Sequence, residues 1–364
     1  MFNDLARQFK KKDFPKLEEF VKKHFHEKYI LSDETFFEWQ YRCNPYVEDY
    51  AFFLLEQDAE LYGYIGLVPL DYKIGGQTVR LNMYANLLVD EHVRGFGLGT
   101  LLIKRAMQEG SPAAISGYTP KSFPIYQKLG DWMALGNFYR YVHVFNSEAV
   151  KKLLPPDIAK QGVILNKGSE GDYGEESREL VFESITTFDA SFDEFWNRVR
   201  NRYAITVERT RAYMGWRYAD HPYLKYEMRL AKKDDQTVGC VVYRVERVND
   251  FSIARIVDFV SDEQAEVGVL EKFVVEVSGI VDIIDFMFSG QYGHDTLKQL
   301  GFFDVYGTPL EHLPMYFSPV SYAKNYINFC AWQEGDFIDK NIFFGYNNWY
   351  LTRGDGDQDR PNPH

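Results

Sequence analysis

The sequence contains few cysteines. Only three occur in 364 residues, Cys43, Cys240 and Cys330, and they lie far apart. So small and scattered a set excludes a disulfide framework, and it offers no pair at the spacing of a zinc site. We therefore expect a cytoplasmic protein that binds no metal.

The sequence also lacks long apolar runs and an excess of positive charge. No stretch approaches the length of a membrane span, and the amino-terminal residues show no apolar segment after a basic start, as a secretory signal would. The formal net charge of -12 argues against a broad nucleic-acid-binding surface. We expect neither a membrane nor a nucleic acid as a partner. A local basic cluster still permits a small anionic ligand: Arg94, Lys104, Arg105, Lys121 and Lys128.

The most informative segment joins an apolar stretch, 87–89, to an amphipathic helix predicted from Thr100 to Ala106. Between them lie Gly95, Gly97 and Gly99. Glycines let the backbone approach an anion closely, and a helix N-terminus directs unpaired N–H groups and the positive end of its dipole at the same point. This arrangement is typical of a diphosphate-binding turn.

The glycine spacing does not fit the two commonest phosphate-binding loops. A P-loop would end in Gly-Lys-Ser or Gly-Lys-Thr, and a dinucleotide-binding turn would read Gly-x-Gly-x-x-Gly. The spacing Arg94-x-x-Gly97-x-Gly99 instead resembles motif A of the GNAT acyltransferase superfamily, in which a strand, a turn and a helix hold acyl-coenzyme A.

A second segment, 118–132, resembles motif B of the same family. Tyr126, Lys128, Leu129 and Gly130 match its pattern, and a strand-like stretch precedes them, as the family order requires. Thr119 and Ser122 depart from the usual Asn and Ala, and Asp131-Trp132 replaces the usual ending. By themselves, a glycine turn and a helical Tyr are more often structural. Together and in this order, they favour the functional interpretation.

The resemblance implies an α/β (α+β) fold of two tandem GNAT-like domains, each a mixed, mostly antiparallel sheet flanked by helices. It also implies direct transfer of an acyl group from acyl-CoA to an amine. Tyr126 would protonate the departing thiolate. The preceding strand lacks the carboxylate base of many GNAT enzymes and has Tyr84 and Asn86 instead, so we expect a water held by these two side chains to deprotonate the amine, unless the amine arrives neutral. The expected coenzyme-binding residues are Leu87, Leu88, Val89, Arg94, Gly95, Phe96, Gly97, Leu98, Gly99 and Thr100.

The chain contains an internal repeat. The segment from Trp39 to Pro45 recurs from Trp216 to Pro222, and Tyr126-Gln-Lys-Leu-Gly130 parallels Leu297-Lys-Gln-Leu-Gly301. Agreement at both ends indicates a duplicated module. We predict a GNAT acyltransferase domain over residues 1–160, a degenerate GNAT-like domain over 161–353 with a linker within 145–179, and a flexible polar tail over 354–364.

The second copy lacks the chemistry of the first. Its corresponding turn has one glycine, no arginine and an additional carboxylate, Glu266, which would repel a diphosphate. Leu297 replaces the tyrosine of motif B. This domain therefore keeps the shape without the coenzyme site, and its remaining role is structural or in binding the acceptor.

The acceptor is inferred from the range of the family and from the aromatic content. We expect a nucleotide-linked amino sugar, such as a dTDP-3-amino-3,6-dideoxyhexose for surface polysaccharide, that receives an acetyl or a larger group such as 3-hydroxybutanoyl. The alternatives are a peptide or protein amine, Fem-like aminoacyl transfer, and a non-catalytic acyl-CoA sensor. The candidate substrate-binding residues are Tyr41, Arg42, Trp216 and Arg217, although both Trp residues could simply pack helices on sheets. The protein is expected to be a monomer or a homodimer.

Overall fold

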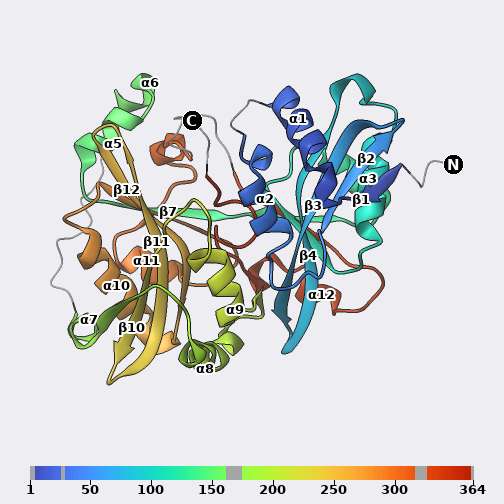
Figure 1. Ribbon diagram of the computed structural model, residues 1–364. Helices are drawn as coiled ribbons and strands as arrows, with labels where there is room; N and C mark the ends of the chain where they lie inside the picture. Colours follow the sequence, from blue (N-terminus) through green and yellow to red (C-terminus); the bar gives the residue numbers. More distant parts are fainter. Residues whose placement is uncertain (1–4, 26–28, 161–173, 316–325, 362–364) are drawn as a thin grey trace.

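The computed structural model describes residues 5–25, 29–160, 174–315 and 326–361. They form two sheets with helices on their faces, one built mainly from the first half of the chain and the other mainly from the second half (Figure 1). The predicted class, two mixed and mostly antiparallel sheets flanked by helices, is confirmed. No helix in these ranges is long and apolar enough to cross a bilayer.

The first sheet has the order β1-β2-β3-β4-β5-β15-β6. Its neighbours are antiparallel except for β4 and β5, which are parallel. β9 pairs with one end of β3, and β16 pairs with β9. The strands are β1 (Ala6–Gln8), β2 (Phe52–Gln57), β3 (Glu60–Ile74), β4 (Gln77–Val89), β5 (Ala113–Ser116), β6 (Met133–Asn137), β9 (Ile205–Val207), β15 (Asn328–Trp332) and β16 (Trp349–Tyr350).

The second sheet repeats this pattern of pairing. Its order is β14-β7-β13-β12-β11-β10-β8, and within it β12 and β13 are the parallel neighbours. Position by position, β12 therefore corresponds to β4 and β13 to β5. The strands are β7 (Tyr139–Val144), β8 (Val181–Ile185), β10 (Glu227–Lys233), β11 (Gln236–Val248), β12 (Phe251–Ser261), β13 (Ile283–Phe288) and β14 (Phe303–Asp304).

Within the two strand orders given above, the sheets exchange one strand each. β7 comes from the first half of the chain but lies between β13 and β14, whereas β15 comes from the second half and lies between β5 and β6. After β7, residues 147–159 also pack on the second sheet, where Val150 and Leu154 join the apolar cluster of Val142 and Ile253. The predicted boundary at residue 160 is therefore wrong, because the chain crosses to the other sheet after Asn137. The centre of the predicted linker, 161–173, lies outside the described residues.

Helices follow equivalent strands in the two sheets. α3 follows β4 and α10 follows β12, and each buries one apolar face; in α3 this face carries Leu102, Ile103 and Ala106. The helices are α1 (Phe14–His24), α2 (Glu34–Tyr41), α3 (Leu98–Met107), α4 (Phe123–Leu129), α5 (Ser147–Leu153), α6 (Pro156–Ala159), α7 (Glu175–Glu179), α8 (Ala190–Val199), α9 (Arg211–Met214), α10 (Glu266–Val277), α11 (His294–Gln299) and α12 (Lys340–Phe343).

The repeated Trp segments meet where the two halves adjoin. The indole N–H of Trp39 donates to the carbonyl oxygen of Trp216, and the indole N–H of Trp216 donates to the carbonyl oxygen of Trp39, each at 2.9 Å. The rings stack with centroids 5.2 Å apart. This reciprocal contact joins equivalent positions of the repeat, and both indole donors are satisfied although they are buried.

The segment 352–361, called the strap below, runs between the two sheets toward the end of the chain (Figure 1). Its Asp355 and Asp359 are buried. Asp355 pairs with Arg209, and Asp359 pairs with Arg244. The predicted flexible tail is thus wrong for 354–361, because these carboxylates are bound by arginines of the second half; residues 362–364 lie outside the described residues.

Candidate active site

A cavity of about 330 Å³ opens where β4 and β5 separate. The two strands pair at Asn82 with Ala113 and at Met83 with Ala114, and no pairing between them continues beyond this point in the described chain. On its other edge β4 shifts register against β3 after Ala85, and Asn86 has a positive φ of 57°. This bulge turns the end of β4 away from β5 and opens the sheet. Residues 85–88 of β4 line the cavity.

Tyr126 reaches the cavity from α4. Thr119 and Ser122, which precede this helix, bind each other reciprocally. The backbone N–H of Thr119 donates to the Ser122 hydroxyl, and the backbone N–H of Ser122 donates to the Thr119 hydroxyl. Pro124 lies in the first turn, where the helix does not need its missing N–H. Tyr126 is 3% exposed, and burial raises the pKa of its hydroxyl. It therefore carries its proton at neutral pH, as a general acid must.

Tyr84 lies beside Tyr126 in the wall of the cavity. Its ring packs against Trp132 with centroids 5.3 Å apart. Its hydroxyl is buried with no hydrogen-bond partner among the described residues, and burial raises its pKa. An unpartnered hydroxyl in such a wall is costly unless another molecule satisfies it. Tyr84 is therefore placed to bind a ligand and is not a base.

The glycine turn follows β4 directly. Gly95 and Gly97 have φ values of 92° and 79°, and a Cβ at either position would meet no atom within 4 Å. Gly97 is the residue before α3 begins, and Gly99 lies against the Val89 side chain. Phe96 at the tip is 78% exposed, and Arg94 donates from Nε to the Val89 carbonyl oxygen at 3.0 Å. The turn is thus exposed, and β4, whose Leu87 and Leu88 line the cavity, leads to it. Leu98 and Thr100 lie in the first turn of α3 and are half-buried.

Asn86 is already engaged by protein groups. Its side-chain N–H donates to the Tyr41 hydroxyl at 2.7 Å, and its side-chain oxygen accepts from Arg360 at 2.8 Å. Asn86 thereby connects α2 to the strap, and the water that it was expected to hold with Tyr84 stays a prediction. Tyr41, which is fully buried, supports Asn86 from behind and does not reach the cavity.

The other predicted substrate residues are also placed differently. Arg217 is buried and donates to the carbonyl oxygens of Gly354 and Asp359, so it binds the strap. Trp216 is buried in the contact with Trp39 described above. Arg42 is exposed after the end of α2 and does not line the cavity. Trp216 and Arg217 thus join parts of the protein to one another, and none of the three residues lines the cavity.

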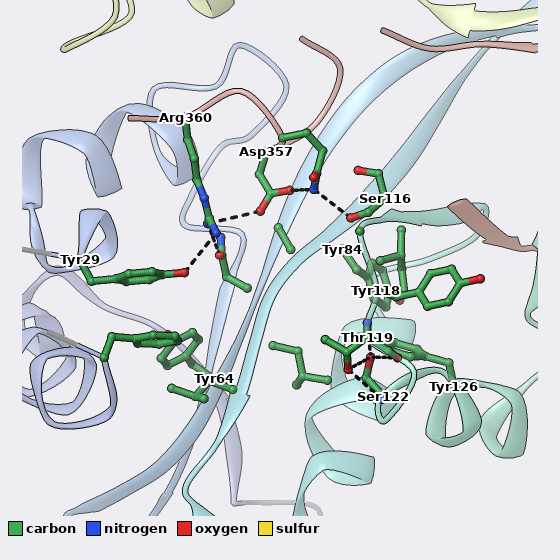
Figure 2. A pocket seen from close by; sticks show the side chains of 18 residues that line it. Tyr29, Tyr64, Tyr84, Ser116, Tyr118, Thr119, Ser122, Tyr126, Asp357 and Arg360 are labelled. Atoms are coloured by element: carbon green, nitrogen blue, oxygen red, sulfur yellow. Dashed lines mark hydrogen bonds and ion pairs between the residues drawn. The ribbon is translucent and has the colours of Figure 1, made fainter. Parts of the chain in front are cut away.

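The strap supplies cavity residues that sequence reasoning missed. Figure 2 shows Asp357 and Arg360 entering the cavity from one side, with Tyr126 on the other. Arg360 donates to the hydroxyl of Tyr29 at 3.1 Å as well as to Asn86. The side chain of Gln358 donates to the Ser116 carbonyl oxygen at 3.0 Å. The signal that was available is the cluster of three aspartates in the strap, a pattern that suits a solvated tail equally well. Phe25, Tyr64 and Tyr118 complete the aromatic lining.

The equivalent place in the second sheet is filled. The space between β12 and β13 measures about 10 Å³. Tyr203 and Tyr350 stack there with ring centroids 4.5 Å apart, and the Tyr350 hydroxyl donates to the Phe259 carbonyl oxygen. Glu266, the first residue of α10, pairs with Arg202 and accepts from Thr296 at 2.6 Å. A carboxylate of the protein thus lies where the first half has an open helix N-terminus.

Metal ligands are not gathered in the part of the chain that the structure describes: it shows no group of three or more His, Cys, Asp or Glu side chains that could hold an ion. The lining of the cavity itself contains hydroxyls, amides, aromatic rings, aliphatic side chains, one carboxylate and one guanidinium among its described residues.

The chain resembles known acyltransferases in sequence and in fold. Residues 6–134 match the family model of the acetyltransferase (GNAT) domain. No curated protein sequence matches the chain. A GCN5-related N-acetyltransferase from Anabaena variabilis ATCC 29413 superposes with a TM-score of 0.58 at 16% identity, covering 90% of this chain and 71% of that one.

Two other solved structures share the fold. A conserved protein of unknown function from Enterococcus faecalis V583, a probable N-acyltransferase, gives a TM-score of 0.59 at 13% identity over 90% of this chain and 72% of that one. The Saccharomyces cerevisiae N-myristoyltransferase with bound myristoyl-CoA gives 0.50 at 12% identity over 82% and 70%. Residues 6–134, which match the GNAT domain model, contain the glycine turn and Tyr126. The predicted resemblance to GNAT acyltransferases is therefore confirmed for this part of the chain.

Proposed function

We propose that this protein is an N-acyltransferase that moves an acyl group from acyl-CoA to a primary amine by direct attack. One observation carries the proposal: the cavity at the split between β4 and β5 contains Tyr126 and is lined by β4 as far as Leu88, and the open glycine turn follows the end of this strand. The diphosphate would bind at Gly95–Gly99 and the start of α3, and the pantetheine arm would follow the unpaired edge of β4. The yeast enzyme of the same fold binds such a thioester.

The chain's own groups suit each chemical step. Backbone N–H groups near Leu87 and Leu88 would polarise the thioester oxygen. The amine would attack the carbonyl carbon, and Tyr126 would give its proton to the departing thiolate. Because burial raises the pKa of Tyr126, the hydroxyl is protonated over the whole physiological pH range. No other group has to supply its proton before each transfer.

The second half would be a degenerate tandem copy with a structural role. The identical order of parallel and antiparallel pairings, the reciprocal Trp39 and Trp216 contact and the strand exchange support a duplicated unit. Tyr203, Tyr350 and Glu266 occupy the positions where a thioester and its phosphates would lie, which supports the loss of coenzyme binding.

For the acceptor we propose a nucleotide-linked amino sugar, such as a dTDP-3-amino-3,6-dideoxyhexose, and an acyl chain of acetyl size or larger. The cavity is bordered by flat rings on which a sugar or a base can stack. Phe25 and Tyr29 form a parallel pair with centroids 4.0 Å apart, and Tyr64 and Tyr118 add two further faces. The polar rim offers the hydroxyls of Thr119 and Ser122.

The test is release of free thiol from acetyl-CoA and 3-hydroxybutanoyl-CoA in the presence of different amines. We expect stimulation by a dTDP-amino sugar and none by a peptide amine. Stimulation by peptides alone would reassign the acceptor. Coenzyme binding by calorimetry without thiol release for any amine would indicate a sensor, and no binding of either thioester would contradict the proposal as a whole.

A further inference from the structure

We propose that Asp357, carried by the strap, is the catalytic base that binds the acceptor's ammonium group and removes its proton. The inference rests on the proposed acyl transfer. It adds the deprotonation of the amine, a step for which Tyr84 and Asn86 of β4 supply no base. It also gives the strap a function: the second half holds the base in the active site of the first.

The lining of the cavity favours Asp357 because the other described groups cannot accept a proton at neutral pH. Asp357 is the only carboxylate among the described residues that line it, and no histidine is among them. The titratable and charged groups that face this space are Arg360 and the hydroxyls of Tyr29, Tyr64, Tyr84, Tyr118 and Tyr126. Burial raises the pKa of Tyr64, Tyr84, Tyr118 and Tyr126, so these hydroxyls stay protonated. An arginine stays charged and donates only.

The carboxylate of Asp357 is oriented by its neighbours and still accessible. One oxygen accepts from the Gln358 side chain at 2.9 Å, and the other lies 3.7 Å from the Arg360 guanidinium. The side chain is 11% exposed. Two oxygens of a carboxylate offer about four acceptor sites. These two contacts leave acceptor capacity on the carboxylate, which lines the cavity.

Two neighbours of Asp357 in the strap, Gln358 and Arg360, fix this segment to β5 and β4. On one side, Gln358 packs on Gly117, where a Cβ would come within 2.8 Å of the amide nitrogen, and it binds the Ser116 carbonyl oxygen. On the other side, Arg360 binds Asn86 at the β4 bulge. Asp357 is thereby held between the ends of β5 and β4, where the two strands separate around the expected thioester.

The second half anchors the strap through buried charges. Asp359 pairs with Arg244 and accepts from the Tyr226 hydroxyl, and Asp355 accepts from Arg209 and Tyr213. The positive neighbours of Asp359, Arg244 first among them, hold its pKa below its usual value against the opposing effect of burial. The pair of Asp359 with Arg244 therefore stays charged at neutral pH, so this anchor does not change in the range where the base works.

The step balances without another reactant. The ammonium gives one proton to the Asp357 carboxylate, directly or through one water, and its freed lone pair forms the C–N bond with the thioester carbonyl carbon. The C–S bond breaks, and the thiolate takes the Tyr126 proton. The proton on Asp357 passes to solvent, and Tyr126 regains one from solvent. The net products are an amide, free thiol and one proton.

The experiment compares Asp357→Asn and Asp357→Glu with wild type across pH, using the amine that proves active. We expect Asp357→Asn to keep its coenzyme affinity and to lose about 10²–10⁴-fold in kcat at pH 7. The deficit should shrink as pH approaches the pKa of the amine, because the amine then arrives neutral. Asp357→Glu should recover part of the rate. Asp336→Asn, which changes an exposed aspartate (side chain 83% exposed), is the matched control and should behave as wild type.

The outcomes separate this inference from the proposed function. A wild-type protein that transfers no acyl group would sink the proposed function itself. A wild-type protein that is active, together with an Asp357→Asn variant of unchanged rate and unchanged pH profile, would overturn only the role of Asp357. A loss of equal size at every pH, with Asp357→Glu equally inactive, would also overturn it and make Asp357 a structural residue. Thermal unfolding of each variant checks that the strap stays in place.

Discussion

The space between β4 and β5 has a counterpart between β12 and β13. The same arrangement of strands surrounds both spaces, but the first is open and side chains fill the second. In the first, a bulge and a glycine turn leave an opening of about 330 Å³; in the second, two stacked tyrosines and a paired glutamate leave about 10 Å³. The order of strands is the same in both. In both sheets the parallel pair separates at one end, and a few side chains decide whether the space there stays open or becomes part of the core.

Substitution of a tyrosine should have the most different effects on kcat in the two spaces. Tyr126→Phe removes the proposed general acid, so kcat should fall about 10²–10⁴-fold while coenzyme affinity stays the same. Tyr350→Phe, the control in the filled space, should leave kcat unchanged and lower the free energy of unfolding by about 1 kcal/mol, since it deletes one buried hydrogen bond. Steady-state kinetics and calorimetry make the measurement. Unchanged turnover in Tyr126→Phe would remove this residue from the mechanism.

A bulky residue in the glycine turn should obstruct coenzyme binding in the first half, as side chains do in the second half. In Gly97→Val, the added side chain covers the amides and opposes the positive φ of 79°, and coenzyme affinity should fall at least ~10-fold, about 1.4 kcal/mol. Gly76→Val is the matched control, because Gly76 also has a positive φ, 92°, and open surroundings but lies in the turn between β3 and β4. Calorimetric titration distinguishes them. Equal effects in both variants would mean that backbone strain, rather than loss of a phosphate contact, explains the result.

Removing the carboxylate from the second half should not restore a site there. In Glu266→Gln, Arg202 and Thr296 lose a charged partner at the start of α10, and the free energy of unfolding should fall by about 1–3 kcal/mol. No second equivalent of coenzyme should bind, because Tyr203 and Tyr350 still fill the space. Denaturant unfolding and binding stoichiometry check both statements. A stoichiometry of two would show that Glu266 alone closes the second space.

The smallest expected effect concerns equivalent positions of the repeat, Asn44 and His221. Each accepts the backbone N–H two residues later, at Tyr46 and Tyr223. Burial, more than the nearby Arg217, lowers the pKa of His221 to about 3. The unfolded chain binds this proton more tightly than the folded one, so stability is full above about pH 6.5 and declines as pH falls below it, by about 1–2 kcal/mol at pH 5.

His221→Asn tests this difference by giving the second half the residue of the first. It keeps the acceptor for Tyr223 and has no proton to bind. The free energy of unfolding should therefore vary less between pH 7 and pH 5 in the variant than in wild type. Parallel curves for the two proteins would show that acid sensitivity comes from other groups.

The sequence allowed the fold and the core of the site to be predicted because local signals were strong there. The strand before the glycine turn and the segment around Tyr126 contain residues that do line the opening, Leu87, Leu88 and Tyr126. The glycines at 95, 97 and 99 form the exposed turn that follows this strand. The burial of Tyr41, Trp216 and Arg217 was not predictable in the same way. Aromatic rings and arginines recognise substrates and also fill interfaces, and only the fold decides between these uses.

The strap and the strand exchange were out of reach for a different reason. Both depend on contacts between residues far apart in the chain, such as Arg217 with Gly354, or β15 between β5 and β6. A segment rich in aspartate and glycine reads locally as a solvated tail. Its burial follows from arginines elsewhere, at 209, 217 and 244, whose own local sequence gives no partner.

The exchanged strand β15 has a consequence for biosynthesis. A ribosome releases β5 and β6 long before residues 328–332, so the edges of β5 and β6 that bind β15 stay unpaired while the second half is being translated. Unpaired edges recruit strands of other chains. An expression fragment that ends near Asn137 keeps those edges permanently and should aggregate, whereas fusing residues 328–332 back onto it through a linker should improve its yield of monomer.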